Sequence, residues 1–331
     1  MTDNDTSQKQ PQTPPPGRTG GKDPRTYVVI TPCRNEEDYM RRTLDSVIAQ
    51  TEPPTLWVIV DDGSTDGGPE ILADYATRYP WIRVITKPDR GNRAVGPGVI
   101  EAFYYGYERI NPEDYTYSCK LDLDLELPPT YFATLMDRME ADPRLGTCSG
   151  KACTRVNGEL VSEGRGDEMS CGMSKFQRRT CFENIGGYVR EVMWDAIDCH
   201  TARYKGWRAA SWDEPELRVD NLRPMGTSQG SVYNGRRRHG FGQWFMGSDP
   251  LYYTASCILH MFKEKPYILG GLAMWWGYVG SWLRRVPQYD NPELRAFIRA
   301  YQRRALIKGK AAAIAEQEAE RAPFWNGGKK S

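Results

Sequence analysis

Short runs of consecutive apolar residues alternate with longer stretches of helical periodicity in the first 127 residues. The apolar runs predict buried strands at 27–30 and 56–60, and two further strands are predicted at 82–85 and 117–121. The stretches between them predict helices at 36–50, about 68–79 and about 99–110. Strands that alternate with helices are typical of βαβ units around a mostly parallel sheet, so the pattern predicts an α/β fold.

The two ends of the chain differ from this pattern. Residues 1–24 are rich in Pro, Gln, Thr and Gly and predict a disordered tail, because they hold too little apolar surface to fold. From about residue 150 the pattern becomes irregular without a clear break, which favours one domain over residues 25–260. Residues 261–331 predict a helical C-terminal extension.

Composition excludes some functions. The chain has 44 Lys and Arg against 43 Asp and Glu, so it carries no basic field that would favour a nucleic-acid partner. Eight cysteines form no CxxC pair and only three His are present, which argues against a zinc site. Most of these cysteines are expected to be buried as small hydrophobic residues. No apolar signal core is visible at the N-terminus, so we expect a cytoplasmic protein.

Polar clusters follow three of the predicted strands. They lie at Thr31–Glu37, Asp61–Asp66 and Asp122–Asp124. Ligands of parallel sheets bind at the carboxyl ends of the strands, so these clusters are candidates for one binding site. In the second cluster the carboxylates precede a Gly turn, where they could bind a base or ribose; a turn capped by Asp and Ser is the alternative.

Asp122 and Asp124 are two residues apart on a predicted strand and therefore point to the same side. Paired carboxylates suit Mg²⁺ or Mn²⁺ that also bridges a diphosphate. Leucines at 121, 123, 125 and 127 alternate with these acids, which fits an amphipathic strand without a metal equally well. The pair alone therefore leaves both interpretations open.

The three clusters in this order resemble the motifs of the family 2 glycosyltransferases. Their sequences here are T-P-C-R-N-E, D-D-G-S-T-D and L-D-L-D, and Phe182–Tyr188 resembles the family's F-x-x-I-G-G-F/Y segment. The resemblance covers roughly residues 26–225. It implies a GT-A fold over 25–260, with a nucleotide-sugar half at 25–127 and an acceptor half at 128–260. It also implies an inverting, metal-dependent enzyme of the bacterial polysaccharide-assembly type.

The resemblance assigns roles to individual residues. Those expected to bind the nucleotide-sugar are Thr31, Pro32, Glu36, Asp61, Asp62, Arg93 and Asp122. Arg34 stands where the family usually has an aromatic residue and could stack on the base through its guanidinium plane. Asp122 and Asp124 are the expected ligands of Mg²⁺ or Mn²⁺. The segment Asp220–Gly226 lacks a His that could supply a third ligand, which leaves that ligand open.

Trp194–Asp198 occupies the position of the family's catalytic acidic pair. Asp195 and Asp198 are three residues apart and therefore neighbours on one helix face. Asp195 is the predicted catalytic base and Asp198 the second choice, while Asp195 as a helix cap is the alternative. We expect His200 to be structural.

A second region suggests that the protein contacts a membrane. Residues 267–282 are uncharged, rich in Trp and Tyr, and flanked by lysines and arginines. Sixteen residues fall short of the roughly 20 that span a bilayer, so the segment predicts a helix at headgroup level, with a core helix as the alternative. The basic segment Gly235–Gly240 is either a solvated loop or a phosphate-binding site.

These features together predict the reaction partners. They are a nucleoside-diphosphate sugar, with UDP the first choice, and a saccharide or polyprenyl-linked saccharide acceptor. The protein would lie peripherally on the inner face of the cell membrane. Two alternatives are a nucleotidyltransferase that makes sugar nucleotides, disfavoured because no Gly-rich loop follows the first strand, and a non-catalytic membrane-associated scaffold.

Overall fold

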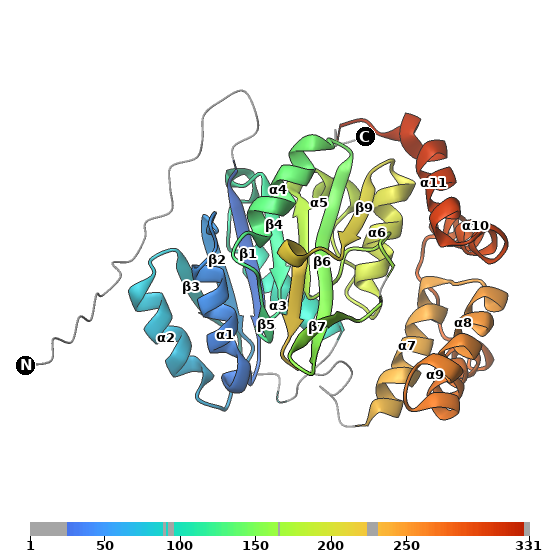
Figure 1. Ribbon diagram of the computed structural model, residues 1–331, viewed down its shortest axis with the longest axis horizontal. Helices are drawn as coiled ribbons and strands as arrows, with labels where there is room; N and C mark the ends of the chain where they lie inside the picture. The colour runs from blue at the N-terminus through green and yellow to red at the C-terminus, as the bar shows by residue number, and fades with distance from the viewer. Residues whose placement is uncertain (1–24, 89–90, 92–95, 165, 224–230, 328–331) are drawn as a thin grey trace, which may run out of the picture.

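The computed structural model describes residues 25–88, 91, 96–164, 166–223 and 231–327. Its centre is a ten-stranded sheet with the order β3-β2-β1-β4-β8-β6-β10-β5, while β7 and β9 pair with β6 (Figure 1). The strands are β1 (Tyr27–Cys33), β2 (Leu56–Asp61), β3 (Ile82–Thr86), β4 (Tyr117–Leu121), β5 (Leu125–Glu126), β6 (Leu145–Val156), β7 (Glu159–Ser162), β8 (Ser174–Arg178), β9 (Arg208–Trp212) and β10 (Arg218–Asn221). The helices are α1 (Glu37–Ile48), α2 (Gly68–Arg78), α3 (Pro97–Tyr107), α4 (Tyr131–Ala141), α5 (Arg179–Ile185), α6 (Trp194–Tyr204), α7 (Val232–Met246), α8 (Pro250–Lys263), α9 (Tyr267–Leu283), α10 (Pro292–Lys308) and α11 (Lys310–Arg321).

Helices cover both faces of the sheet. One apolar cluster joins the sheet to α1, α2 and α4, and a second joins it to α3, α5 and α6. Strands β1 to β4 are parallel. Strands β1, β2 and β4 are almost entirely buried because both of their faces are covered, whereas the edge strand β3 is partly exposed. The α/β prediction is therefore confirmed, and the helices and strands predicted up to residue 121 form within a few residues of their expected bounds.

The second half of the sheet is antiparallel in part. Strand β8 runs antiparallel to both β4 and β6, and β5 pairs antiparallel with β10. The alternating leucines at 121, 123, 125 and 127 are all buried, as predicted. The chain leaves β4 after Leu121, so Asp122 and Asp124 lie in the connection between β4 and β5.

The C-terminal helices begin earlier than expected. All described residues after β10 lie in helices or their connections, starting at Val232 rather than at residue 261. Gly235–Gly240 belongs to α7, so its interpretation as a loop is wrong. Ser231 caps α7 by accepting a hydrogen bond from the Tyr233 amide. The proposed division of the chain into domains stays a prediction.

The cysteines pack as the sequence predicts. All eight cysteines are buried and unpaired, as expected for small hydrophobic residues. Within the described ranges, no helix has the length and apolar character needed to cross a bilayer. The predicted tail at 1–24 and Arg93 lie outside the described residues.

Candidate active site

The loops after β1 and β2 are locked together by hydrogen bonds. The amide of Asn35, which has a left-handed backbone (φ 54°), donates to Ser64 Oγ at 3.0 Å, and the Thr65 amide donates to Asn35 Oδ1 at 2.8 Å. The Ser64 amide in turn donates to Asp61 Oδ1 at 2.9 Å. The first two predicted motifs therefore form one structural unit at the carboxyl ends of neighbouring strands.

Within this unit the predicted nucleotide-binding residues have different surroundings. Asp62 is buried and its Oδ1 lies 3.1 Å from Lys87 Nζ, while Arg34 donates to the Asp62 carbonyl. Pro32 is half-buried at the end of β1. Thr31 is fully buried, and its hydroxyl accepts a hydrogen bond from the Trp57 indole at 2.8 Å. The Thr31 side chain therefore belongs to the core, and the expected role of Thr31 in binding the nucleoside stays a prediction that only its backbone could fulfil.

Arg223 connects the first motif with the third. Its guanidinium forms an ion pair with the buried Glu36 and lies 3.5 Å from Asp124 Oδ2. It also lies over the ring of Tyr39. Arg223 is not among the predicted site residues, although it lies in the segment Asp220–Gly226, which lacks a His for a third metal ligand.

Asp122 lies close enough to Asp124 to affect its ionisation. Burial and the charge of Asp122 raise the pKa of Asp124 to about 6, against the opposing effects of Arg223 and Lys120. Lys120 forms an ion pair with Asp122. A divalent cation would stabilise the ionised form of Asp124 beside the second carboxylate, so the residues fit Mg²⁺ or Mn²⁺.

The protein contributes few further ligands. No group of three or more His, Cys, Asp or Glu side chains in the described ranges could hold a metal ion. Asp220 is buried and lies 2.6 Å from Arg155 Nε, so it is engaged elsewhere. We therefore expect most of the remaining ligands to come from the diphosphate of the donor and from water.

Helix α6 places Asp195 beside the sheet. The N-cap of this helix is Met193, and Asp195 makes no capping hydrogen bond, so its interpretation as a cap is wrong. The Asp195 carboxylate is half-buried and has no hydrogen bond or ion pair to any described residue. Gly172 leaves room for it, because a Cβ at that position would lie 2.9 Å from Asp195 Oδ2 and 3.0 Å from Trp194.

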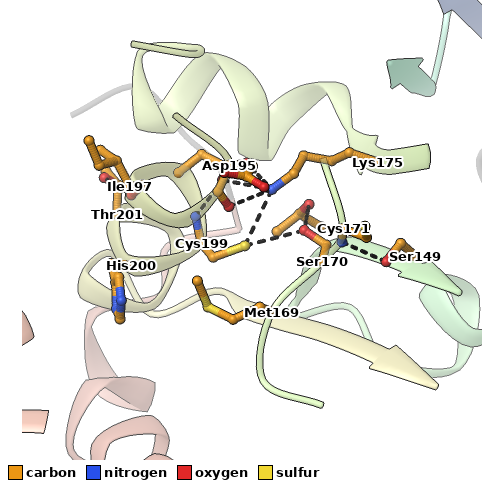
Figure 2. A network of polar contacts seen from close by, with 12 residues as sticks. Ser149, Met169, Ser170, Cys171, Lys175, Asp195, Ile197, Cys199, His200 and Thr201 are labelled. Atoms are coloured by element: carbon orange, nitrogen blue, oxygen red, sulfur yellow. Dashed lines mark hydrogen bonds and ion pairs between the residues drawn. The ribbon is translucent and has the colours of Figure 1, made fainter. Parts of the chain in front are cut away.

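Asp198 has a different environment. Both of its oxygens lie 2.7 Å from Lys175 Nζ, and both side chains are fully buried. Lys175 also donates to the Asp195 carbonyl at 2.9 Å and contacts Cys199 Sγ at 3.3 Å (Figure 2). Burial raises the pKa of Asp198 to about 6, although Lys175 opposes this.

Asp198 is therefore unsuited to the role of second-choice base, since it is only 2% exposed and an acceptor could not reach it. Instead, the Lys175–Asp198 pair ties the first turn of α6 to β8. We did not predict Lys175. The only sequence signal is a lysine inside the short strand Ser174–Arg178, which does not by itself distinguish a buried lysine from an exposed one.

Two lysines connect the halves of the site. Lys120 on β4 and Lys175 on β8 are cross-strand neighbours, and their Nζ atoms lie 5.5 and 5.6 Å from the Trp194 ring centroid. One pairs with Asp122 and the other with Asp198. His200 is buried, and desolvation lowers its pKa well below the usual value, which supports its predicted structural role.

Comparison with known proteins agrees with this arrangement. Residues 28–191 match the model of Glycosyl transferase family 2. The chain is 32% identical over 132 residues to the uncharacterized glycosyltransferase YibD of Escherichia coli, a match that spans 40% of this chain and 36% of YibD. It is 24% identical over 132 residues to the poly-beta-1,6-N-acetyl-D-glucosamine synthase of Staphylococcus epidermidis, covering 40% of this chain and 29% of the synthase.

Among solved structures, GalNAc-T7 with UDP, GalNAc and Mn²⁺ aligns with a TM-score of 0.55 and 16% identity, over 91% of this chain and 58% of that chain. At this identity the likeness concerns the fold, which is that of the GT-A glycosyltransferases. Residues 28–191, just under half of the chain, form a glycosyltransferase family 2 domain.

Proposed function

We propose that this chain is an inverting glycosyltransferase that moves a sugar from a nucleoside-diphosphate sugar to an acceptor hydroxyl in polysaccharide biosynthesis. The observation that carries the proposal is the pair of acidic sites on α6 and after β4. The Asp195 carboxylate has no partner among the described residues, whereas burial and the charge of Asp122 raise the pKa of Asp124. The lysines beside Trp194 link the two sites.

Asp195 would act as the base. It accepts the proton of the acceptor hydroxyl while the hydroxyl oxygen attacks the anomeric carbon and the nucleoside diphosphate departs. A single displacement inverts the configuration at that carbon and needs no protein nucleophile. The Lys175–Asp198 pair would hold the backbone at Asp195, so that its carboxylate keeps a fixed direction.

The donor would bind at the strand ends. Asp61, Asp62, Glu36 and Arg34 would hold the nucleoside, with Asp122 near the ribose or the metal. Mg²⁺ or Mn²⁺, held by Asp122 and Asp124, would neutralise charge on the leaving diphosphate. UDP is the first choice of nucleotide, in keeping with the UDP and Mn²⁺ named for GalNAc-T7.

The acceptor would be a saccharide or a polyprenyl-linked saccharide. A lipid-linked acceptor requires the enzyme to work at a membrane, and we propose a peripheral position on the inner face of the cell membrane. The apolar, basic-flanked helix α9 supports this part of the proposal.

Calorimetric titration tests donor binding. UDP, GDP and dTDP are each titrated with Mn²⁺, with Mg²⁺ and with EDTA into the full chain and into Asp124→Ala. We expect one nucleotide to bind in a metal-dependent manner, with binding lost in Asp124→Ala and kept in the control Asp74→Ala on the exposed face of α2. No metal-dependent binding to any nucleotide would contradict the proposal and favour a non-catalytic scaffold.

Inversion needs a separate measurement. Once a donor is known, the anomeric configuration of the product can be compared with that of the donor by NMR. A retained configuration would contradict the single displacement with Asp195 as base.

A further inference from the structure

Helices α8 and α9 expose an unusual number of large apolar side chains. Four such residues lie on α8 and eight on α9, including Phe262 at 74% exposure. They are Leu251, Ile258, Leu259, Phe262, Tyr267, Ile268, Leu269, Leu272, Trp275, Trp276, Trp282 and Leu283. A contiguous exposed apolar surface of this kind marks a contact with a partner or a membrane.

The opposite side of α9 explains why these residues face outward. Gly240 on α7 packs against the Met274 carbonyl, and Gly277 on α9 packs against the Arg237 carbonyl, so closely that neither position has room for a Cβ. Gly271 approaches the Cys257 carbonyl of α8 in the same way. The glycine side of α9 is therefore used for packing within the protein, and the Trp- and Leu-rich side is left exposed.

The charges around this surface are nearly all positive. Between residues 232 and 285 the chain has seven Lys and Arg but only two acidic residues, Asp249 and Glu264. Asp249 is buried as the cap of α8 and pairs with Arg303, while Glu264 pairs with Arg236. The net charge of the surface is thus positive, which complements an anionic partner.

A pocket of about 300 Å³ opens beside the apolar surface, between α7 and α9. Its lining residues include Arg237, Arg238 and Arg284, together with Asn234 and the partly exposed Trp276. Arginine and asparagine side chains gathered at one cavity are suited to bind phosphate oxygens.

We infer that α8 and α9 dock on an anionic membrane, with their apolar residues (the docking surface) among the headgroups and the arginine pocket around a lipid phosphate. Trp, Tyr, Lys and Arg at the edge of an apolar face are the composition of helices that lie at a membrane interface. A second copy is a poorer occupant. In a two-fold dimer this surface would face itself and bring its positive charges together.

This inference deepens the proposed function, because docking would bring the candidate active site to a lipid-linked acceptor. It therefore rests on the proposed function. Its test uses no transfer reaction. Nucleotide titration of the same preparations reports on the donor site separately, so either proposal can fail alone.

The test measures binding of the full chain to vesicles of phosphatidylcholine alone and of phosphatidylcholine with phosphatidylglycerol, by flotation. We expect binding to the anionic vesicles that weakens as salt is added. The double variant Leu259→Ser with Phe262→Ser should lose binding to the anionic vesicles. The control Ile307→Ser, which changes an exposed apolar residue on α10, should bind as the unaltered chain does.

The pocket is tested by two variants that remove equal charge. Each basic residue near an anionic surface contributes about fivefold to binding, so Lys263→Gln with Lys265→Gln should cost roughly 30-fold. Arg237→Gln with Arg284→Gln should cost clearly more, because it also removes direct phosphate ligands. Equal losses would overturn the pocket as a headgroup site.

Two results would overturn the docking surface. One is absence of binding to anionic vesicles while nucleotide binding is intact. The other is a dimer in light scattering that Leu259→Ser with Phe262→Ser converts to a monomer, with no change in vesicle binding.

Discussion

The sheet domain and the α8–α9 hairpin differ in which side chains they bury and which they expose. The sheet domain buries charged groups and pairs them, as with Lys175 and Asp198 or Glu36 and Arg223. The hairpin leaves large apolar groups exposed on a basic surface. Each departs from the usual rule that charge is outside and apolar surface inside. The difference is the one that the two proposals require, with reacting groups in the sheet domain and a membrane-docking surface on the hairpin.

The largest expected effect separates chemistry from stability in the sheet domain. Asp195→Asn should lower the transfer rate by about 10²–10⁴-fold, because it removes a general base and keeps the shape of the side chain. Nucleotide binding and unfolding should stay as in the unaltered chain. Initial rates measure the transfer, and calorimetry measures nucleotide binding and unfolding. Asp74→Asn on α2 is the matched control. Full activity of Asp195→Asn would exclude it as the base.

Breaking the buried Lys175–Asp198 pair should lower stability more than breaking an exposed ion pair. Lys175→Met leaves Asp198 buried without a partner and should lower the free energy of unfolding by about 3–5 kcal/mol. Arg78→Met, which breaks the exposed pair with Asp74, should cost less than about 1 kcal/mol. Denaturant titrations compare the two. Adding Asp198→Asn to Lys175→Met should recover part of the loss, and a further loss instead would contradict the proposed ion pair.

The effect of pH on metal binding should be smaller than the effects of these substitutions. Because the pKa of Asp124 is raised to about 6, its carboxylate is protonated below that pH and ionised above it. Metal binding needs the ionised form, so Mn²⁺ affinity should rise with pH and level off above about 6, changing about tenfold per unit below it. Titrations with Mn²⁺ across this range measure the change. An affinity that stays constant from pH 5 to 7, a range of about two units around this pKa, would contradict the role of Asp124.

The smallest effect is expected on the hairpin. Phe262→Ser should change the free energy of unfolding by no more than about 0.5 kcal/mol, since the side chain is exposed. Leu44→Ala in the core of α1 should cost about 2–5 kcal/mol. Denaturant titration checks both. A large cost for Phe262→Ser would show that another surface covers this residue in solution.

The donor side of the site was more predictable than the acceptor side. Asp61, Asp62, Asp122 and Asp124 follow strands that the apolar runs identify, and parallel strands bring their carboxyl ends to one edge. Arg223 and Lys175 could not be predicted in this way. Their partners, Glu36 and Asp198, are 187 and 23 residues away along the chain.

Asp195 and Asp198 on α6 illustrate most directly what sequence-based prediction could not provide. Their spacing correctly indicates neighbouring positions on one helix, yet one carboxylate is buried against Lys175 and the other is open. A helical period fixes the angle between two side chains and not what packs against each of them.

The sequence by itself therefore determined the α/β class, the order of the first strands and helices, and the family, because these depend on local apolar periodicity and on contiguous motifs. The tertiary structure decided which charges pair, that Thr31 serves the core, and that α8 and α9 leave an apolar basic face exposed. Those outcomes depend on contacts between segments far apart in the chain, and the local pattern of residues carries no record of them.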